Sequence, residues 1–184
     1  MKRGFKKFLF GLWEILEVSL IAAVTVFLIR TFLVQPFLVS GASMEPNFSD
    51  GNYLLVDEVT YRFRTPERGE VVVFRYPLDK SLFFIKRIIG MPEERVVSQN
   101  GRIKIFKNGV EIMLDESYLL PTAKPSDNFD IKLSADQYFV LGDNRSHSFD
   151  SRNWGAIYRR DIVGVARLRI LPIRDFGVFE APSY

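Results

Sequence analysis

Three segments of this chain carry residue types that could act together in catalysis. A serine, Ser43, lies in the small-residue sequence Gly-Ala-Ser-Met-Glu-Pro at positions 41–46. A lysine, Lys86, lies within an apolar run at positions 82–89, and a third segment, 142–152, concentrates charged and hydroxyl side chains. Serine becomes a nucleophile when a base removes its proton. These residue types therefore predict hydrolytic chemistry by an activated serine.

The local sequence around Ser43 suits an exposed nucleophile. Glycine and alanine precede it, and Met44 and Pro46 follow it. Small residues allow a tight turn in which a hydroxyl is exposed and backbone N–H groups converge. An ordinary turn serine has the same local sequence, so the hypothesis needs a base elsewhere in the chain.

The apolar run around Lys86 favours a lysine that is removed from water. If positions 82–89 form a strand, Phe84, Lys86 and Ile88 share one face and Arg87 points to the other. Burial disfavours the ammonium form and lowers the lysine pKa, which makes the neutral amine available as a base. The alternative is a lysine with a buried stem and a solvated tip.

The third segment offers a rival base. His147 could join Asp143 or Asp150 and serve Ser43 as a Ser/His/Asp triad, which recurs on unrelated folds. In the lysine hypothesis, Ser148 could instead hold the lysine by a hydrogen bond while the charged residues brace the loop. Sequence spacing does not separate the two bases, and both hypotheses stay open at this point.

Composition excludes most other hydrolase chemistries. The chain has 184 residues, no cysteine and one histidine. Disulfides, thiolate catalysis, cysteine-based zinc sites and multi-histidine metal sites are therefore impossible. The formal net charge of +3 is too small to imply a nucleic-acid partner.

An apolar segment precedes the serine. From Phe8 to Val39 few residues are charged, and the stretch from Val18 to Ile29 carries no charge. This length predicts one membrane-spanning helix, since a bilayer span needs about 20 mainly apolar residues. Pro36 disfavours helix at the residue before it and predicts the end of the helix. The charged residues of the segment are Glu14, Glu17 and Arg30.

The orientation of this helix follows from charge. The positive-inside rule keeps a basic N-terminus in the cytoplasm. We therefore expect residues 1–35 to form a cytoplasmic basic tip and a single transmembrane anchor, and residues 36–184 to form an extracytoplasmic β-rich domain. A cleaved signal peptide and a buried amphipathic helix are the alternatives. The basic residues at the N-terminus are Lys2, Arg3, Lys6 and Lys7.

Beyond the anchor the sequence has the period of β-strands. Alternation on both sides of Asn108-Gly109 predicts a β-hairpin, because this dipeptide supplies the positive φ angles of a type I′ turn, and Asn100-Gly101 predicts a second one. Residues 121–130 predict a loop. No helical period follows the anchor, so the predicted class is mainly β, a compact all-β catalytic domain with a small β-hairpin extension. Apolar runs predict buried strands at positions 53–56, 71–74, 138–141 and 162–166.

Taken in order, these segments resemble bacterial type I signal peptidase, a membrane-bound serine–lysine enzyme that removes signal peptides from exported proteins. The resemblance runs from the N-terminal anchor to about Pro172. The Ser-Met-Glu-Pro sequence at 43–46 is similar to the nucleophile box. Positions 86–92 are similar to the general-base box and positions 142–152 to the last box. Each box is weak alone, whereas their order after an anchor is specific.

The resemblance implies a role for each matching residue. Ser43 resembles the nucleophile, Lys86 the general base, and Ser148 the hydroxyl that orients the lysine. Further residues resemble the charged scaffold and the oxyanion site of the family. These scaffold residues are Gly41, Met44, Arg87, Asp143, Asp150 and Arg152.

Four residues depart from the family pattern. Asn47 stands where threonine is usual, and Glu93-Glu94 replaces a common Gly-Asp. Gly41 stands where some members have a serine whose hydroxyl assists the oxyanion hole. This last departure leaves the oxyanion to backbone N–H groups, among them that of Ser43.

The resemblance implies a membrane-anchored serine endopeptidase that cleaves N-terminal signal peptides from exported preproteins after small residues. Its partners would be preprotein signal peptides and membrane lipid, close to the protein-export translocon, with no nucleic acid and no cofactor. Two alternatives stay open at this point. One is a related self-cleaving serine–lysine protease, and the other is a non-enzymatic anchored β-domain that binds an extracytoplasmic partner.

Overall fold

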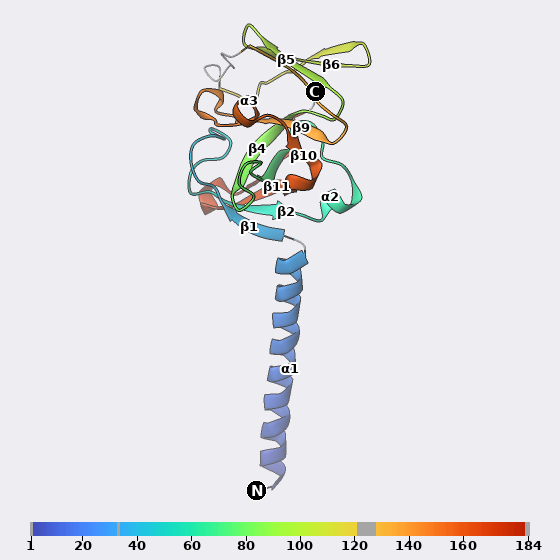
Figure 1. Cartoon of the computed structure of the whole chain (residues 1–184). Helices are drawn as coiled ribbons and strands as arrows, with labels where there is room; N and C mark the ends of the chain where they lie inside the picture. The colour runs from blue at the N-terminus through green and yellow to red at the C-terminus, as the bar shows by residue number, and fades with distance from the viewer. Residues whose placement is uncertain (1, 33, 121–127, 183–184) are drawn as a thin grey trace.

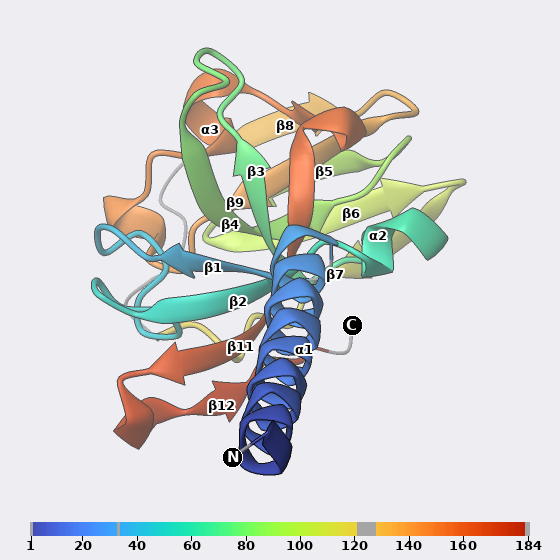
Figure 2. The same cartoon turned by 90° about the horizontal axis from the view of Figure 1, so that it is seen from below.

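The computed structural model describes residues 2–32, 34–120 and 128–182. One long helix, α1 (Lys2–Phe32), leads directly into a domain of antiparallel strands. Figure 1 shows the helix standing away from that domain, and Figure 2 shows it from below. The strand-rich domain after a single long helix confirms the predicted fold class.

Helix α1 is apolar over a length that could cross a membrane. Its window Phe10–Phe27 has 18 residues and a mean hydropathy of 1.8, and none of it is buried inside the protein. A helix of this length spans about 27 Å, close to the hydrocarbon thickness of a bilayer. The rest of the domain therefore leaves this apolar surface uncovered.

The strands and helical turns of the described residues are short. The large sheet contains β1 (Val34–Leu38), β2 (Tyr53–Asp57), β3 (Val71–Arg75), β4 (Phe83–Gly90), β9 (Gln137–Leu141), β10 (Ile157–Tyr158), β11 (Ile162–Leu171) and β12 (Gly177–Val178). The small sheet contains β5 (Arg95–Gln99), β6 (Arg102–Lys107), β7 (Val110–Met113) and β8 (Phe129–Lys132). The helical turns are α2 (Thr60–Phe63), α3 (Ser151–Trp154) and 3-10 turns at Arg145–His147, Arg159–Asp161 and Ile173–Asp175.

The large sheet places the predicted base near its middle. Its strands run in the order β1-β2-β11-β3-β4-β9-β10, and β12 pairs with β11. Strand β4 lies between β3 and β9, so that Lys86 stands opposite Val72, and Arg87 stands opposite both Val71 and Leu141. Neighbours on both edges and buried faces explain why β4 is buried from Lys86 onward.

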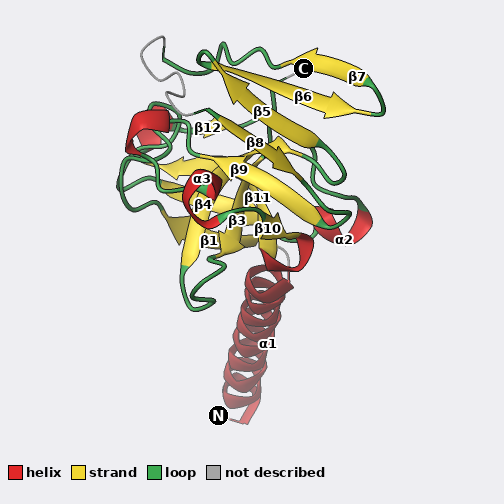
Figure 3. Ribbon diagram, turned by 45° about the horizontal axis from the view of Figure 1, so that its top comes forward, coloured by secondary structure: helices red, strands yellow, loops and turns green. Residues whose placement is uncertain are grey.

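A second sheet, in the order β7-β6-β5-β8, forms the extension (Figure 3). The turns that join its first three strands are Asn100-Gly101 and Asn108-Gly109, and all four residues have positive φ angles. Both predicted hairpins are confirmed, since type I′ turns require this conformation. The extension shares a buried apolar cluster with β9, which attaches it to the large sheet.

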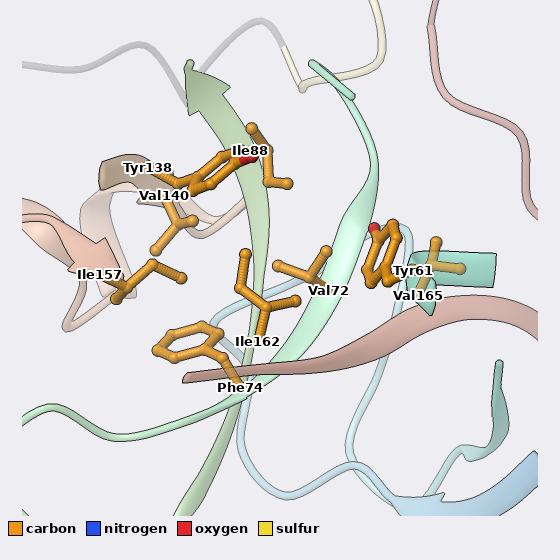
Figure 4. Packing of buried hydrophobic residues seen from close by; sticks show 9 residues of the cluster. All are labelled: Tyr61, Val72, Phe74, Ile88, Tyr138, Val140, Ile157, Ile162 and Val165. Carbon is orange, nitrogen blue, oxygen red and sulfur yellow. The ribbon is translucent and has the colours of Figure 1, made fainter. Parts of the chain in front are cut away.

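Figure 4 shows the buried cluster that holds β4 in place. Ile88 of β4 lies opposite Val140 of β9, and both are fully buried. Burying a side chain of this size stabilises the fold by about 1.5–3 kcal/mol. Ile88 lies two residues from Lys86, so this packing fixes the strand that carries the lysine. The cluster consists of Tyr61, Val72, Phe74, Ile88, Tyr138, Val140, Ile157, Ile162 and Val165.

The end of the long helix differs from the prediction. Pro36 predicts the helix end, but α1 ends at Phe32 and Pro36 lies inside β1, opposite Leu55. Strand β1 is the outermost strand of its sheet. A proline is tolerated there because its missing N–H can face away from the only partner strand.

The predicted loop at 121–130 is wrong at its end. Positions 121–127 lie outside the described residues, whereas Phe129 and Asp130 belong to β8. Phe129 packs against Phe139 with ring centroids 5.2 Å apart, and Asp130 forms an ion pair with Arg95 of β5. These contacts between strands form only in the folded sheet, and they override the local turn propensity of the segment.

Candidate active site

The turn that carries Ser43 is held by hydrogen bonds to its neighbours. The Glu45 N–H donates to the Ala42 carbonyl at 3.2 Å, and the Gly41 N–H donates to Asp50 Oδ1 at 2.7 Å. Gly41 has a φ angle of +87°, a conformation that glycine adopts without steric cost. The backbone around the serine is therefore held in one shape.

Met44 anchors the same turn in the core. Its side chain is 1% exposed and packs in a buried cluster with Phe48 and Leu54. The buried Met44 side chain attaches the turn to the core directly beside Ser43, which is only half-buried. Gly41 and Met44, both predicted as scaffold residues, thus flank the serine.

Lys86 Nζ lies 2.7 Å from Ser43 Oγ, although the two residues are 43 positions apart. The lysine is 4% exposed, and its Nζ also donates to the Ile85 carbonyl at 2.8 Å. Burial lowers the pKa of Lys86 to about 8, against an opposing effect of the Asp150 and Asp143 carboxylates. A substantial fraction of the amine is therefore neutral in mildly alkaline solution.

An aromatic cluster stands beside this amine. Lys86 Nζ lies 5.7 Å from the centre of the Phe84 ring. Tyr76 stacks on Phe84 with ring centroids 4.7 Å apart, and Trp154 meets Phe84 edge-on at 5.5 Å. These rings restrict water on one side of the amine and so contribute to the burial that lowers its pKa. Phe84 and Ile88 contact the same cluster, as the predicted alternation along the strand requires.

Arg87, the next residue, forms a buried ion pair with Asp143. Its Nε donates to Asp143 Oδ1 at 2.8 Å and its Nη2 to Oδ2 at 2.7 Å. The guanidinium also donates to the Gly69 carbonyl at 2.7 Å and lies over the Tyr118 ring at 4.2 Å. Two parallel charge-assisted bonds fix both distance and direction. They tie β4 to the segment 142–152.

Asp150 and Arg152 brace that segment from its other end. Arg152 donates to both Asp150 oxygens, at 2.8 and 2.9 Å, and to the Arg145 carbonyl at 2.6 Å. Asp150 also accepts the Gly142 N–H at 3.1 Å and caps the N-terminus of α3. These bonds close the segment on itself and set its shape beside the lysine.

Ser148 lies beside the nucleophile turn but makes no hydrogen bond with Lys86. Its Oγ is buried and has no hydrogen-bond partner in the parts of the chain that the structure describes. A Cβ built on Gly142 would lie 2.2 Å from Ser148 Oγ and 2.4 Å from the Ser43 carbonyl oxygen. Only glycine fits between these two serine-bearing segments, and it allows their close approach.

His147 lines the same open pocket as Ser43 and Lys86 but lacks the contacts of a triad histidine. Its Nδ1 lies 2.9 Å from Ser146 Oγ and 3.2 Å from Asn144 Oδ1. Among the described residues it makes no hydrogen bond with Ser43. Both carboxylates that could have oriented it are paired with arginines instead.

An open cleft of about 440 Å³ borders Ser43 and Lys86. Its apolar lining includes Leu38, Leu54 and Val73, so Ser43 and Lys86 border a largely apolar surface. Across residues 2–32, 34–120 and 128–182, no group of three or more His, Asp or Glu side chains is arranged to hold a metal ion.

Some supporting residues were not identified from the sequence. The Asn47 amide donates to Asp143 Oδ2 at 2.8 Å and to the Tyr118 carbonyl at 3.3 Å. Arg145 is fully buried and pairs with Glu116 at 2.6 Å. The sequence analysis identified Asn47 only as a residue that stands where threonine is usual. No local pattern marks Tyr118 or Glu116, because their partners are distant in the sequence.

The Glu93-Glu94 departure is accommodated by the turn after β4. Glu93 has a φ angle of +66°, which explains why glycine is common at this position. Glu94 is buried and accepts hydrogen bonds from Arg68 at 2.7 and 2.8 Å and from the Met91 N–H at 2.8 Å. Its carboxylate stabilises the turn at a distance from the serine and the lysine.

Comparisons with known proteins agree with this architecture. Residues 12–171 match the family described as signal peptidase, peptidase S26. The chain is 38% identical over 174 residues to a probable signal peptidase I-2 of Synechocystis sp., covering 90% of this chain and 77% of that protein. It is 36% identical over 168 residues to signal peptidase I P of Bacillus subtilis subsp. natto, covering 86% and 88% respectively. These matches exclude the non-enzymatic alternative, and the chain belongs to the signal peptidases of family S26, which are serine endopeptidases.

Proposed function

We propose that this chain is a membrane-anchored signal peptidase in which Ser43 is the nucleophile and Lys86 is the general base. The observation that carries the proposal is the 2.7 Å distance between Lys86 Nζ and Ser43 Oγ. The lysine is 4% exposed, and burial lowers its pKa to about 8. General-base catalysis requires a neutral amine within hydrogen-bond distance of the hydroxyl it activates.

The reaction is acyl transfer through an acyl-enzyme. Neutral Lys86 takes the Ser43 proton while Oγ attacks the scissile carbonyl, and the resulting ammonium donates a proton to the leaving amine. Lys86 then removes a proton from water as the oxygen of that water attacks the acyl carbon, and the Lys86 ammonium returns the proton to Ser43 Oγ as the acyl product leaves. Backbone N–H groups of the serine turn stabilise the oxyanion in both halves. One donor of this kind is worth about 10²–10³ in rate.

The charged scaffold holds the two reacting groups in position. The pair Arg87–Asp143 ties the lysine strand to the last segment, and the pair Asp150–Arg152 shapes that segment. We assign Ser148 the role of orienting the lysine amine during turnover. Its hydroxyl is buried near the nucleophile turn and has no other partner among the described residues.

The apolar cleft beside the dyad suits the carboxyl end of a signal peptide. Its walls come from both β1 and β4, with Leu38 and Phe83 among them. Strand β1 is an edge of the large sheet, so an extended peptide can add to it as a further strand. Small side chains at the −1 and −3 positions of the substrate let its backbone approach Ser43 closely.

Helix α1 is assigned as the membrane anchor. No described part of the chain covers the apolar window Phe10–Phe27. Apolar surface exposed to water costs about 25 cal/mol per Å², so lipid is the stable surrounding for this helix. The basic residues before it place the N-terminus in the cytoplasm and the domain of residues 36–184 outside, near emerging preproteins.

Topology is tested by protease added to intact spheroplasts. Digestion of the β-rich domain without lysis is the expected result. Digestion only after lysis would reverse the orientation. Release of the chain by a carbonate wash would show that α1 lies on the membrane surface and does not span it.

The dyad is tested by cleavage of a purified preprotein by the full-length chain in detergent. Ser43→Ala and Lys86→Ala should each abolish cleavage, while Ser134→Ala, at an exposed serine just after β8 of the extension, should retain it. N-terminal sequencing of the product should locate the cut after a small residue. Substantial activity in Ser43→Ala would reject the proposed nucleophile.

A further inference from the structure

Asn144 makes two hydrogen bonds to the backbone on either side of Ser43. Its side-chain Nδ2 donates to the Ala42 carbonyl at 3.1 Å, and its backbone N–H donates to the Ser43 carbonyl at 3.0 Å. Asn144 follows Asp143, whose carboxylate is held by Arg87 on β4. The asparagine is therefore carried by a fixed segment and reaches the nucleophile turn from about 100 positions away.

The Ala42 carbonyl and the Ser43 N–H belong to the same peptide group. A trans peptide is planar, and its C=O and N–H point in opposite directions. A donor that holds the carbonyl oxygen therefore also fixes the direction of the N–H. Hydrogen bonding to the carbonyl polarises the peptide as well and makes its N–H a stronger donor.

The Ser43 N–H is available as an oxyanion donor. Among the described residues, neither the Ser43 N–H nor the Met44 N–H donates a hydrogen bond within the chain. The Ala42 carbonyl accepts only one other bond there, from the Glu45 N–H at 3.2 Å. That contact belongs to the turn itself, whereas Asn144 ties the peptide to a separate segment.

No side chain at position 41 can replace this contribution. Gly41 has none, and a Cβ built there would meet no atom within 4 Å. The space that a side chain at position 41 would enter is open. Stabilisation of the oxyanion in this chain therefore depends on how well the backbone N–H is directed.

The opposite end of the Asn144 amide is held as well. Ser146 Oγ donates to Asn144 Oδ1 at 3.3 Å, and His147 Nδ1 lies 3.2 Å from the same oxygen. These contacts keep the oxygen on the outer side and turn Nδ2 toward Ala42. In this arrangement His147 supports Asn144 by a contact with its amide oxygen and exchanges no proton with Ser43.

We propose that Asn144 is a positioning residue of the oxyanion hole, whose amide directs and strengthens the Ser43 N–H through the Ala42 carbonyl. This inference rests on the proposed role of Ser43 as nucleophile. It adds a residue that acts on the oxyanion without touching the substrate.

The test uses Asn144→Ala and Asn144→Asp in the full-length chain. Both keep the backbone N–H that holds the Ser43 carbonyl, and the aspartate keeps the shape of the side chain without its donor. We expect kcat for preprotein cleavage to fall about 10–100-fold, less than the factor of about 10²–10³ that loss of an oxyanion donor itself costs, with KM within about twofold of the parent value. In Asn144→Ala the acid limb of the pH profile should stay in place, because the contacts of Lys86 are unchanged. Asn128→Ala, at an exposed asparagine of the extension, is the matched control and should leave kcat unchanged.

A pair of inhibitors separates oxyanion positioning from a structural effect. A substrate-like peptide aldehyde forms a hemiacetal with Ser43 and places an oxygen in the hole, whereas the same peptide ending in an alcohol does not. The aldehyde should lose affinity by the same factor as kcat/KM, and the alcohol should bind as before. Equal losses for both peptides, or a kcat/KM within twofold of the parent, would overturn the inference. Activity in Ser43→Ala would instead overturn the proposed nucleophile, so the two failures are distinguishable. If the alanine variant does not fold, the aspartate variant decides alone.

Discussion

Arg87 donates through two nitrogen atoms to both carboxylate oxygens of Asp143, and the side chains are 6% and 0% exposed. The pair joins residues 56 positions apart, and Arg87 directly follows Lys86 in the sequence. Its negative partner raises the pKa of Lys86 against the larger effect of burial. One ion pair therefore both holds the site together and contributes to the pH at which it works.

Asp143→Asn should shift the acid limb of kcat/KM to lower pH. The change removes a negative charge that raises the pKa of Lys86 and leaves the positive charge of Arg87 without this carboxylate. Both effects favour the neutral amine. Breaking a buried pair typically costs about 3–5 kcal/mol, so the melting temperature should fall as well. Asp130→Asn, in an exposed ion pair of the extension, should change neither quantity much. A limb that moves to higher pH would contradict this electrostatic assignment.

Lys86→Ala should abolish preprotein cleavage, and His147→Ala should retain most of it. Lys86 contacts Ser43 Oγ directly, whereas His147 contacts only Ser146 and Asn144. Initial rates of cleavage at equal enzyme concentration measure both variants. An inactive histidine variant together with an active lysine variant would establish the triad in place of the dyad.

Activity should rise with pH through a midpoint near 8. The neutral form of Lys86 is the base, and burial lowers its pKa to about 8, so the competent fraction increases as pH passes that value. The measurement is kcat/KM against pH, with enzyme stability checked at each point. A profile that is flat from about pH 5 to 10 would remove lysine as the base.

Lys86→Met should stabilise the fold at neutral pH. The lysine pKa is about 8 in the folded chain and ordinarily 10.5, so below pH 8 the folded state must bury an ammonium. Methionine removes this cost, which is up to about 3 kcal/mol. The parent chain should gain stability as pH rises from 8 to 10.5, because the unfolded state binds more protons in that window. The measurement is the melting temperature of the parent and Lys86→Met chains from pH 6 to 11. The difference between the two should shrink as the pH rises toward 10.5. Lys132→Met, at an exposed position, should leave the parent curve unchanged in shape.

A chain that begins at Val34 should still cleave a soluble peptide. It keeps all of β1 and the dyad, and it loses only the helix that we assign as anchor. Cleavage of membrane-embedded preproteins should fall much more, because a shared membrane raises the effective concentration of enzyme and substrate. The ratio of the two activities, at constant detergent, compares the truncated and full-length chains. An unchanged ratio would show that α1 is a tether without a role in substrate presentation.

Local sequence was sufficient to predict much of the fold. The Asn-Gly dipeptides determine both hairpins of the extension, because their positive φ angles depend on residue type and not on distant contacts. The apolar runs predicted β2, β3, β9 and the first half of β11 for a similar reason. Pro36 and Asp130 misled the prediction, because in each case pairing with a neighbouring strand outweighed local propensity.

The sequence by itself determined the chemistry that is available: one serine in a small-residue turn, one lysine in an apolar run, no cysteine and a single histidine. It left the choice between Lys86 and His147 as base to family resemblance, because spacing along the chain does not fix distance in space. The tertiary structure brings Lys86 Nζ to 2.7 Å from Ser43 Oγ. It pairs Asp143 and Asp150, the carboxylates that a triad would need, with arginines. It also brings Asn47 and Asn144 against the nucleophile turn and the ion pair beside it. Such contacts arise only when antiparallel strands bring distant segments into register, and this is why only the folded chain could reveal them.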